Sequence, residues 1–285
     1  MTDDEIYEMA ARVDYSDAQR YVLSRGWVKY PSSPEDLGCF HFKKHDVHLP
    51  MNRAFLDYDS AMVRFATLVA RAEGRRFEHV LLDLAAKDVD RHRTARVGAK
   101  DASLEATLGL LEGMQRGLSA VAFSVLQPRP VHPPFGPAEV QRFVNAARFA
   151  NTEEGSFVVV IDTPLEVEDA AESFGRNASI LFMRSIAHLV RSLKRRAPER
   201  IVHPSPAAPV VSANLCEALL KMAPKSEASD LRFAVSWSPS RDNPVGVPKE
   251  VTLDRSMYEA LEKVADQLRR QEPRPAMRRA RKAKG

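Results

Sequence analysis

Proline most constrains how this chain can fold, because five of its 19 prolines fall within residues 127–137. Each proline fixes its own φ and lacks a backbone donor, so a run this dense can continue neither a helix nor a central strand. We therefore expect an extended, semi-rigid connector here. It predicts an N-terminal subdomain over residues 1–127 and a C-terminal subdomain over residues 138–270.

The composition is that of a globular protein, with 44% hydrophobic and 28% charged residues among 285. The longest apolar stretch, Leu104–Leu126, contains Glu105, Glu112 and Arg116, which argues against a membrane span. Two cysteines and an acidic first turn argue against a disulfide framework and a secretory leader. Arginines outnumber lysines, as in many GC-rich bacterial genomes. We expect a bacterial, cytoplasmic protein that does not contact a membrane.

Positive charge is concentrated at the C-terminus. The last 17 residues hold eight basic side chains and one acid, a net charge of +7, so the residues before them carry −3 of the total of +4. The eight are Arg269, Arg270, Arg274, Arg278, Arg279, Arg281, Lys282 and Lys284. Nothing after Pro275 can form a core, so residues 271–285 are expected to be a disordered basic tail. This tail, and not a generally basic fold, accounts for the sequence pI of about 9.1.

Hydrophobic periodicity predicts both helices and strands. Alternation within residues 39–50 predicts a hairpin, and a β-branched run at 157–161 predicts a strand buried on both faces. Further strands are expected at 231–237 and 251–253. Helices with one apolar face are expected near 17–25, 60–73, 76–85, 104–126, 137–150, 177–196, 212–222 and 256–270. The pattern indicates an α+β fold of two subdomains, with small antiparallel or mixed sheets covered by amphipathic helices.

A basic stripe is the first candidate site. Arg184, His188, Arg191 and Arg195 recur at spacings of four, three and four, which places them on one face of the predicted helix at 177–196. Such a stripe could contact phosphates, with the tail residues Arg278, Arg279, Arg281 and Lys282 adding to it. The alternative is a solvated outer face that needs no partner.

The hairpin holds the second candidate. Cys39, His41 and His48 are predicted to project from the face opposite the apolar one, with His45 at the turn. Three such ligands could approach Zn²⁺ from one side, although their spacing matches no standard zinc module. The alternative is a polar, solvated face. We expect no other cofactor and assign no catalytic residue.

The same region resembles the small double-stranded-RNA-binding-like fold of the HicA-type toxin ribonucleases. The resemblance covers roughly 60 residues and runs through a helix, Gly26-Trp27, a strand pair and a second helix. In that family a histidine after a Gly-Ser pair acts in RNA cleavage. The matching stretch here is Gly38-Cys39-Phe40, and His41 is displaced from the family position by one residue.

The predicted helix at 104–126 carries Gly109, Gly113 and Gly117 on one face. Each glycine costs a helix about 1 kcal/mol relative to alanine, so close approach of another backbone is the expected compensation. Packing within the chain is favoured over a dimer seam, and the oligomeric state stays open.

Motifs that would identify a reaction are absent from the sequence. It contains no phosphate-binding loop ending in Lys-Ser/Thr, no dinucleotide fingerprint, no His-Glu-x-x-His and no Gly-x-Ser-x-Gly. The sequence therefore favours a non-enzymatic binding or adaptor protein that contacts nucleic acid through the basic helix face and tail. Two alternatives stay open, namely a nuclease or metal-dependent hydrolase that uses the His-rich hairpin, and a protein–protein assembly module.

Overall fold

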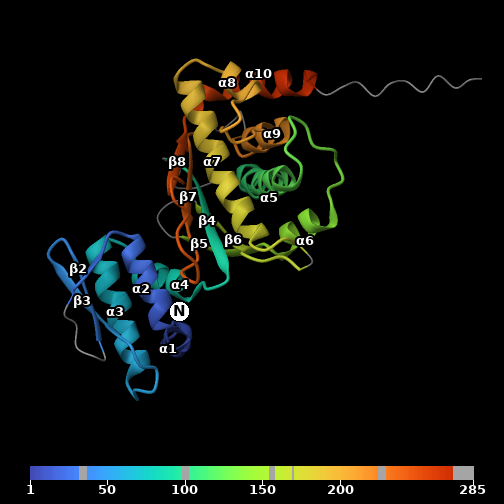
Figure 1. Ribbon diagram of the computed structural model, residues 1–285. Helices are drawn as coiled ribbons and strands as arrows, with labels where there is room; N and C mark the ends of the chain where they lie inside the picture. Colours follow the sequence, from blue (N-terminus) through green and yellow to red (C-terminus); the bar gives the residue numbers. More distant parts are fainter. Residues whose placement is uncertain (32–36, 98–102, 154–157, 169, 224–228, 272–285) are drawn as a thin grey trace, which may run out of the picture.

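The computed structural model describes residues 1–31, 37–97, 103–153, 158–168, 170–223 and 229–271 (Figure 1). Within these residues the strands form two antiparallel sheets, one of three strands in the order β1-β2-β3 and one of five in the order β5-β6-β4-β7-β8. Helices cover both sheets. The predicted α+β fold class is confirmed.

The first part of the chain builds the small sheet and its helices. Its elements are α1 (Asp3–Arg12), α2 (Tyr15–Ser24), β1 (Val28–Lys29), β2 (Leu37–Phe42), β3 (His45–Pro50), α3 (Tyr58–Glu73) and α4 (Phe77–Ala85). Thr2 and Glu5 form a capping box at the start of α1, and Gly74 ends α3 in the left-handed conformation. In Figure 1, α2 and α3 lie on one side of the hairpin β2–β3, and the other face of the hairpin is turned outward.

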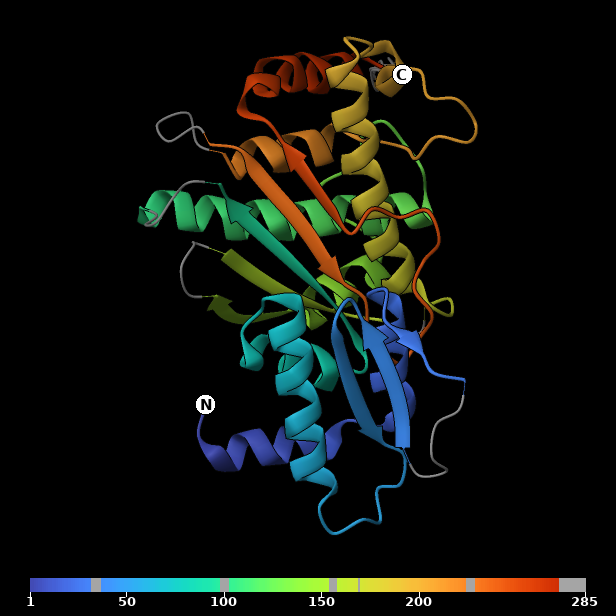
Figure 2. The ribbon, with the colours of Figure 1, turned by 90° about the vertical axis from the view of Figure 1, so that its left-hand side faces the viewer.

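The rest of the chain builds the larger sheet. Its elements are β4 (Val89–Arg96), α5 (Leu104–Leu126), α6 (Ala138–Ala146), β5 (Arg148–Glu153), β6 (Val158–Pro164), α7 (Phe174–Lys194), α8 (Glu199–Val202), α9 (Ala213–Lys221), β7 (Leu231–Ser236), β8 (Glu250–Leu253), η2 (Arg255–Met257) and α10 (Tyr258–Arg270). Side chains 158–161 of β6 are all buried, as the β-branched run predicts. Figure 2, seen from the side of the small sheet, shows β2 and β3 in the foreground below the larger sheet.

The packing of helices on the two sheets forms two large hydrophobic cores. One joins α1–α4 to β2 and β3, and the other joins α5, α6, α7, α9 and α10 to the larger sheet. The change from one unit to the other lies between Ala85 and Val89, because α4 belongs to the smaller core, β4 is a strand of the larger sheet and α5 belongs to the larger core. The proline connector, where the sequence predicts the subdomain boundary, lies within the second of these units. Whether either unit folds independently stays a prediction.

The proline connector lies across the larger core. The backbone of Pro130 accepts a hydrogen bond from Ala213 at 2.7 Å, and His132 exchanges two hydrogen bonds with Asn214. The imidazole of His132 also stacks on Phe123 at 4.5 Å between centroids. The connector is thus a strap held against α5 and α9, because buried backbone groups must find hydrogen-bond partners.

Two strands differ from the sequence expectations. Residues 148–150 were predicted as the end of a helix, but α6 ends at Ala146 and the chain continues as β5. β4 was not predicted, because its sequence alternates charged and polar residues where a central strand is usually apolar. It is nevertheless the middle strand of the larger sheet, and charges from other elements compensate its arginines.

The glycine face of α5 packs within the chain. A Cβ built on Gly113 would lie 2.7 Å from the carbonyl oxygen of Ala218, and one on Gly109 would lie 2.8 Å from that of Lys221. These carbonyls belong to α9, so the glycines allow the two helix backbones to approach closely. The face is therefore internal, as favoured, and it is not available as a dimer seam.

Candidate functional sites

The predicted basic stripe lies on the outer face of α7. Arg184, Arg191 and Arg195 are exposed and His188 is half-buried, whereas the opposite side of the helix is packed into the larger core. The guanidinium of Arg184 donates to the Val245 carbonyl at 3.2 Å. His188 Nε2 contacts the Arg200 carbonyl at 3.1 Å, and Arg191 donates to the backbone of its own helix. These contacts are to backbone groups, and within the part of the chain that the structure describes no carboxylate lies within 4 Å of these side chains.

Three further cations lie at or just after the C-terminal end of α7. Lys194, Arg196 and Arg200 are exposed, and residues 174–198 contain no aspartate or glutamate. Among the described residues, none of these cations lies within 4 Å of a carboxylate. We call the seven residues the α7 basic surface: Arg184, His188, Arg191, Lys194, Arg195, Arg196 and Arg200. The tail residues Arg278, Arg279, Arg281 and Lys282 lie outside the described residues.

The open face of the small sheet carries the chemistry of the hairpin. Cys39 pairs with His48 across the strands, with Sγ 3.3 Å from Nδ1, and His41 pairs with Asp46, with Nδ1 2.9 Å from Oδ1. The side chains of His41 and Asp46 are 43% and 57% exposed. Hydrogen bonds from His41 and then from Tyr30, whose hydroxyl is 3.0 Å away, lower the pKa of Asp46.

The metal-site hypothesis is not supported by this geometry. Cys39, His41 and His48 share the open face as predicted, but His41 is paired with Asp46 and Cys39 with His48. Within the described ranges, no three His, Cys, Asp or Glu side chains are grouped closely enough to hold a metal ion. Phe40, the position that matches the ribonuclease histidine, is fully buried on the opposite face.

Sequence reasoning missed Asp46 as the partner of His41. His45 was predicted at the turn, whereas the turn consists of Lys43 and Lys44, with Lys43 at a positive φ of 55°. A two-residue turn sets the register so that position 41 lies opposite position 46. The length of the turn was therefore the sequence feature from which the pairing of His41 with Asp46 could have been predicted.

A buried charge cluster joins the two cores. The carboxylate of Asp83 in α4 contacts Arg75 at 2.7 Å, Arg93 at 2.7 Å and Arg91 at 3.3 Å. Arg91 also forms two hydrogen bonds of 2.7 Å with Asp162 in β6. Burial acts to raise the pKa of Asp83, but the arginines outweigh it and hold that pKa well below its usual range. The cluster fixes α4 against the larger sheet.

A second buried cluster lies between the larger sheet and α7. Ser179 lies 3.1 Å from His92 Nε2 and 3.1 Å from the Thr163 hydroxyl, and Asp90 lies 3.0 Å from Arg176. Burial lowers the pKa of His92 to about 3 and raises the pKa of Asp90 to about 6, although Arg176 opposes the latter shift. These side chains are all buried, so we assign them to sheet–helix packing.

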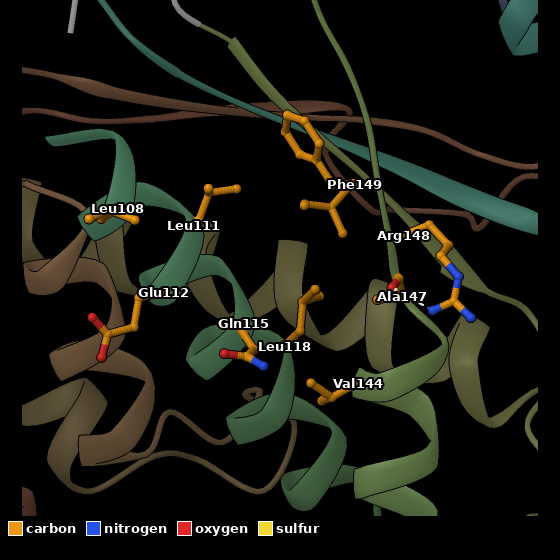
Figure 3. A pocket seen from close by; sticks show the side chains of 10 residues that line it. Leu108, Leu111, Glu112, Gln115, Leu118, Val144, Ala147, Arg148 and Phe149 are labelled. Atoms are coloured by element: carbon orange, nitrogen blue, oxygen red, sulfur yellow. Dashed lines mark hydrogen bonds between the residues drawn. The ribbon is translucent and has the colours of Figure 1, made fainter. Parts of the chain in front are cut away.

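A pocket of about 470 Å³ opens between α5, α6 and the strands β5 and β6. Figure 3 shows Glu112 and Arg148 at opposite ends of it, with Leu111, Leu118 and Phe149 between them. Sequence analysis did not anticipate this pocket, because its lining comes from segments about 40 residues apart in the chain.

No family model, curated protein or solved structure matches this chain. Among the described helices, none is both long and apolar enough to cross a membrane.

Proposed function

We propose that this protein binds nucleic acid through the α7 basic surface. The observation that carries the proposal is seven basic residues on and beside one rigid helix, with no carboxylate within 4 Å among the described residues. Asp254, which interacts with Lys194, and the exposed Glu199 are acids beside this surface, so its cations outnumber its acids and create a local field that attracts polyanions. Phosphate contacts of this kind supply most of the non-specific affinity for nucleic acid.

The spacing of the surface suits a phosphate backbone. Arg184 and Arg195 are 11 residues apart, which is about 16 Å along a helix. A strand of duplex DNA carries one phosphate per 3.4 Å of axis, so several phosphates fall within this length. The net charge of −3 on residues 1–268 favours binding at this face over general coating of the protein.

A salt series tests this proposal. We would measure binding of duplex DNA and of RNA to the full chain, to a chain ending at Gln271, and to the triple variant Arg184, Arg191, Arg195→Ala. The matched control removes three exposed arginines elsewhere, Arg12, Arg64 and Arg71→Ala. For three lost phosphate contacts, the slope of log affinity against log salt should fall by about 3 on duplex DNA. Equal slopes for the two triple variants would contradict the proposal, and so would binding that depends on the tail alone.

The open face of the small sheet supports a second candidate function, cleavage of RNA without a metal ion. His41 is held by Asp46, and His48 is its diagonal neighbour on the same face, roughly 7 Å away between Cβ atoms. With Nδ1–H donating to Asp46, Nε2 of His41 can accept the proton of a ribose 2′-hydroxyl. That oxygen then attacks the adjacent phosphorus, and His48 protonates the departing 5′-oxygen. The products are a 2′,3′-cyclic phosphate and a 5′-hydroxyl.

Cleavage of a labelled RNA in the presence of a chelator tests this candidate. His41→Ala and His48→Ala should each slow cleavage by about 100-fold or more, because a positioned general acid or base contributes at least that much. His203→Ala, at an exposed histidine directly after α8, serves as the control. Loss of activity with the chelator, or equal activity in His41→Ala and His203→Ala, would exclude the mechanism.

A further inference from the structure

A cleft opens where the two units of the chain meet, between α2 and the segment that joins β7 to β8. Its outer part has a volume of about 230 Å³ and its inner part a volume of about 30 Å³. Both parts are lined by Tyr21, Ser24, Trp237 and Asn243. The volume lies just below the range of about 300–1,000 Å³ typical of ligand sites, so the cleft suits a small molecule.

Among the described residues, two cations and no acid line the inner part of the cleft. They are Arg25, directly after α2, and Lys249, directly before β8. The guanidinium of Arg25 lies over the ring of Tyr21, 4.9 Å from its centroid, and Nζ of Lys249 donates to the carbonyl of Ser24. Because Tyr21 and Ser24 both line the cleft, these contacts hold both cationic groups at its inner end.

The carboxylates nearest to Arg25 leave its N–H groups free to bind a ligand. Glu73 and Asp83 lie 3.5 and 3.7 Å from the guanidinium, which is longer than an ordinary hydrogen bond. Both carboxylates also pair with Arg75. Within the described part of the chain, the guanidinium of Arg25 forms no hydrogen bond. It is half-buried and carries five N–H groups, so it has donors for an anion in the cleft.

Lys249 adds a second positive charge close to the first. Partial burial of its ammonium group and then the charge of Arg25 lower the pKa of Lys249, whereas Glu73 opposes the shift. The two cations are therefore close enough to repel each other, and an anion between them would relieve the repulsion. The side chains of Asn243 and Trp237 line the same space, and neither has a hydrogen-bond partner among the described residues. Their amide and indole N–H groups are further donors.

The outer part of the cleft is balanced in charge. Arg20 pairs with Asp17 at 3.3 Å, and Arg241 pairs with Glu166. Asp242 also lines this part and is exposed. The preference for an anion therefore arises at the inner end.

We propose that this cleft binds a small phosphate monoester. The phosphate lies where the inner part opens into the outer part, and its oxygens accept hydrogen bonds from Arg25 and Lys249. The organic group lies in the outer part, against Leu23 and Trp237. A phosphate monoester carries a charge of about −1.5 to −2 at pH 7 and three acceptor oxygens, so it matches two cations better than a carboxylate does. The site does not involve the α7 basic surface and does not depend on nucleic-acid binding.

Calorimetric titration of the full chain with three small probes tests the proposal. Glycerol phosphate should bind with one-to-one stoichiometry and at least tenfold more tightly than glycerate, in which a carboxylate replaces the phosphate. Glycerol should not bind, because it lacks the anion. Equal affinity for glycerol phosphate and glycerate would overturn the assignment of a phosphate, and no binding of glycerol phosphate would overturn the site.

Two variants of the cleft locate the binding. Lys249→Gln should weaken binding of glycerol phosphate about tenfold, because a hydrogen bond to a charged group contributes at least that much. Asn243→Asp should weaken it similarly, because it places a negative charge beside the phosphate. Neither residue belongs to the buried ion pairs around Asp83, so the thermal unfolding midpoint should stay the same in both. Lys263→Gln, at an exposed position on α10, is the control and should bind as the wild type does.

A last comparison separates this site from the α7 basic surface. The triple variant Arg184, Arg191, Arg195→Ala should bind glycerol phosphate with unchanged affinity. Reduced affinity in the triple variant would place the phosphate on α7 and overturn the proposal. Unaltered affinity in both Lys249→Gln and Asn243→Asp would overturn it as well.

Discussion

Nη2 of Arg93, in the middle strand of the larger sheet, lies 2.7 Å from Oδ1 of Asp83 in α4. This contact crosses between the two hydrophobic cores. The side chain of Asp83 is only 1% exposed, so water can contribute little to stabilising its charge. Contacts with Arg75, Arg91 and Arg93 therefore stabilise the charge of the Asp83 carboxylate, and the carboxylate in turn stabilises theirs.

Asp83→Asn should therefore destabilise the protein strongly. Removing the central carboxylate from a buried ion network costs about 3–5 kcal/mol, because Arg75, Arg91 and Arg93 all lose a charged partner, although Arg91 retains Asp162 and Arg75 retains Glu73. Urea denaturation at pH 7 would measure this loss. Asp266→Asn, at an exposed position on α10, is the control and should change the unfolding free energy by less than about 0.5 kcal/mol. A loss below about 1 kcal/mol in Asp83→Asn would contradict the role of the cluster.

His92 should make the protein sensitive to acid. Burial lowers its pKa to about 3 from the ordinary value of 6.5, so the unfolded state binds more protons than the folded state between these values. Stability from this group is complete above pH 6.5 and is lost as the pH falls toward 3, by at most about 1.4 kcal/mol per pH unit. Unfolding free energies of the wild type and His92→Asn from pH 7 to 4 would show a smaller acid loss in the variant. Parallel curves would contradict the prediction.

Asp90 should have the opposite pH dependence. Its pKa is raised from 3.8 to about 6, so the folded state binds more protons than the unfolded state between these values. The contribution of Asp90 to stability therefore decreases as the pH rises from about 4 to 6, and it is constant above that range. Asp90→Asn removes this titration, so the variant should gain stability relative to the wild type over the same interval. A relative stability that does not change with pH would show that Asp90 titrates normally.

Gly113→Ala should destabilise the protein without changing its mass in solution. The added Cβ would lie 2.7 Å from the Ala218 carbonyl, and overpacking of this kind costs about 1–3 kcal/mol. Gly117→Ala should cost less, since its Cβ would lie 3.1 Å from the ring of Phe182. Light scattering and thermal unfolding would measure mass and stability together. A changed mass in Gly113→Leu with stability retained would instead indicate that the glycine face lies between subunits.

The sequence by itself determined where the elements lie that bury one continuous face or stripe and expose the other. The spacing of apolar residues placed α3, α5, α7 and the hairpin close to where they lie, because each buries a single face or stripe against a core. The same periodicity placed Arg184 and Arg195 on the exposed face of α7. It also placed Cys39, His41 and His48 on the open face of the small sheet.

Only the tertiary structure decided how those elements meet. β4 carries Arg91 and Arg93 at positions that a sequence pattern treats as exposed, but Arg91 is buried and Arg93 half-buried, because Asp83 and Asp162 from other elements compensate their charges. The pairing of His41 with Asp46 depends on a register set by the turn. The pocket between α5 and β5 is lined by segments that are far apart in the chain. Local propensity acts over a few residues, whereas charge compensation, register and cavities arise from contacts between segments far apart in the chain.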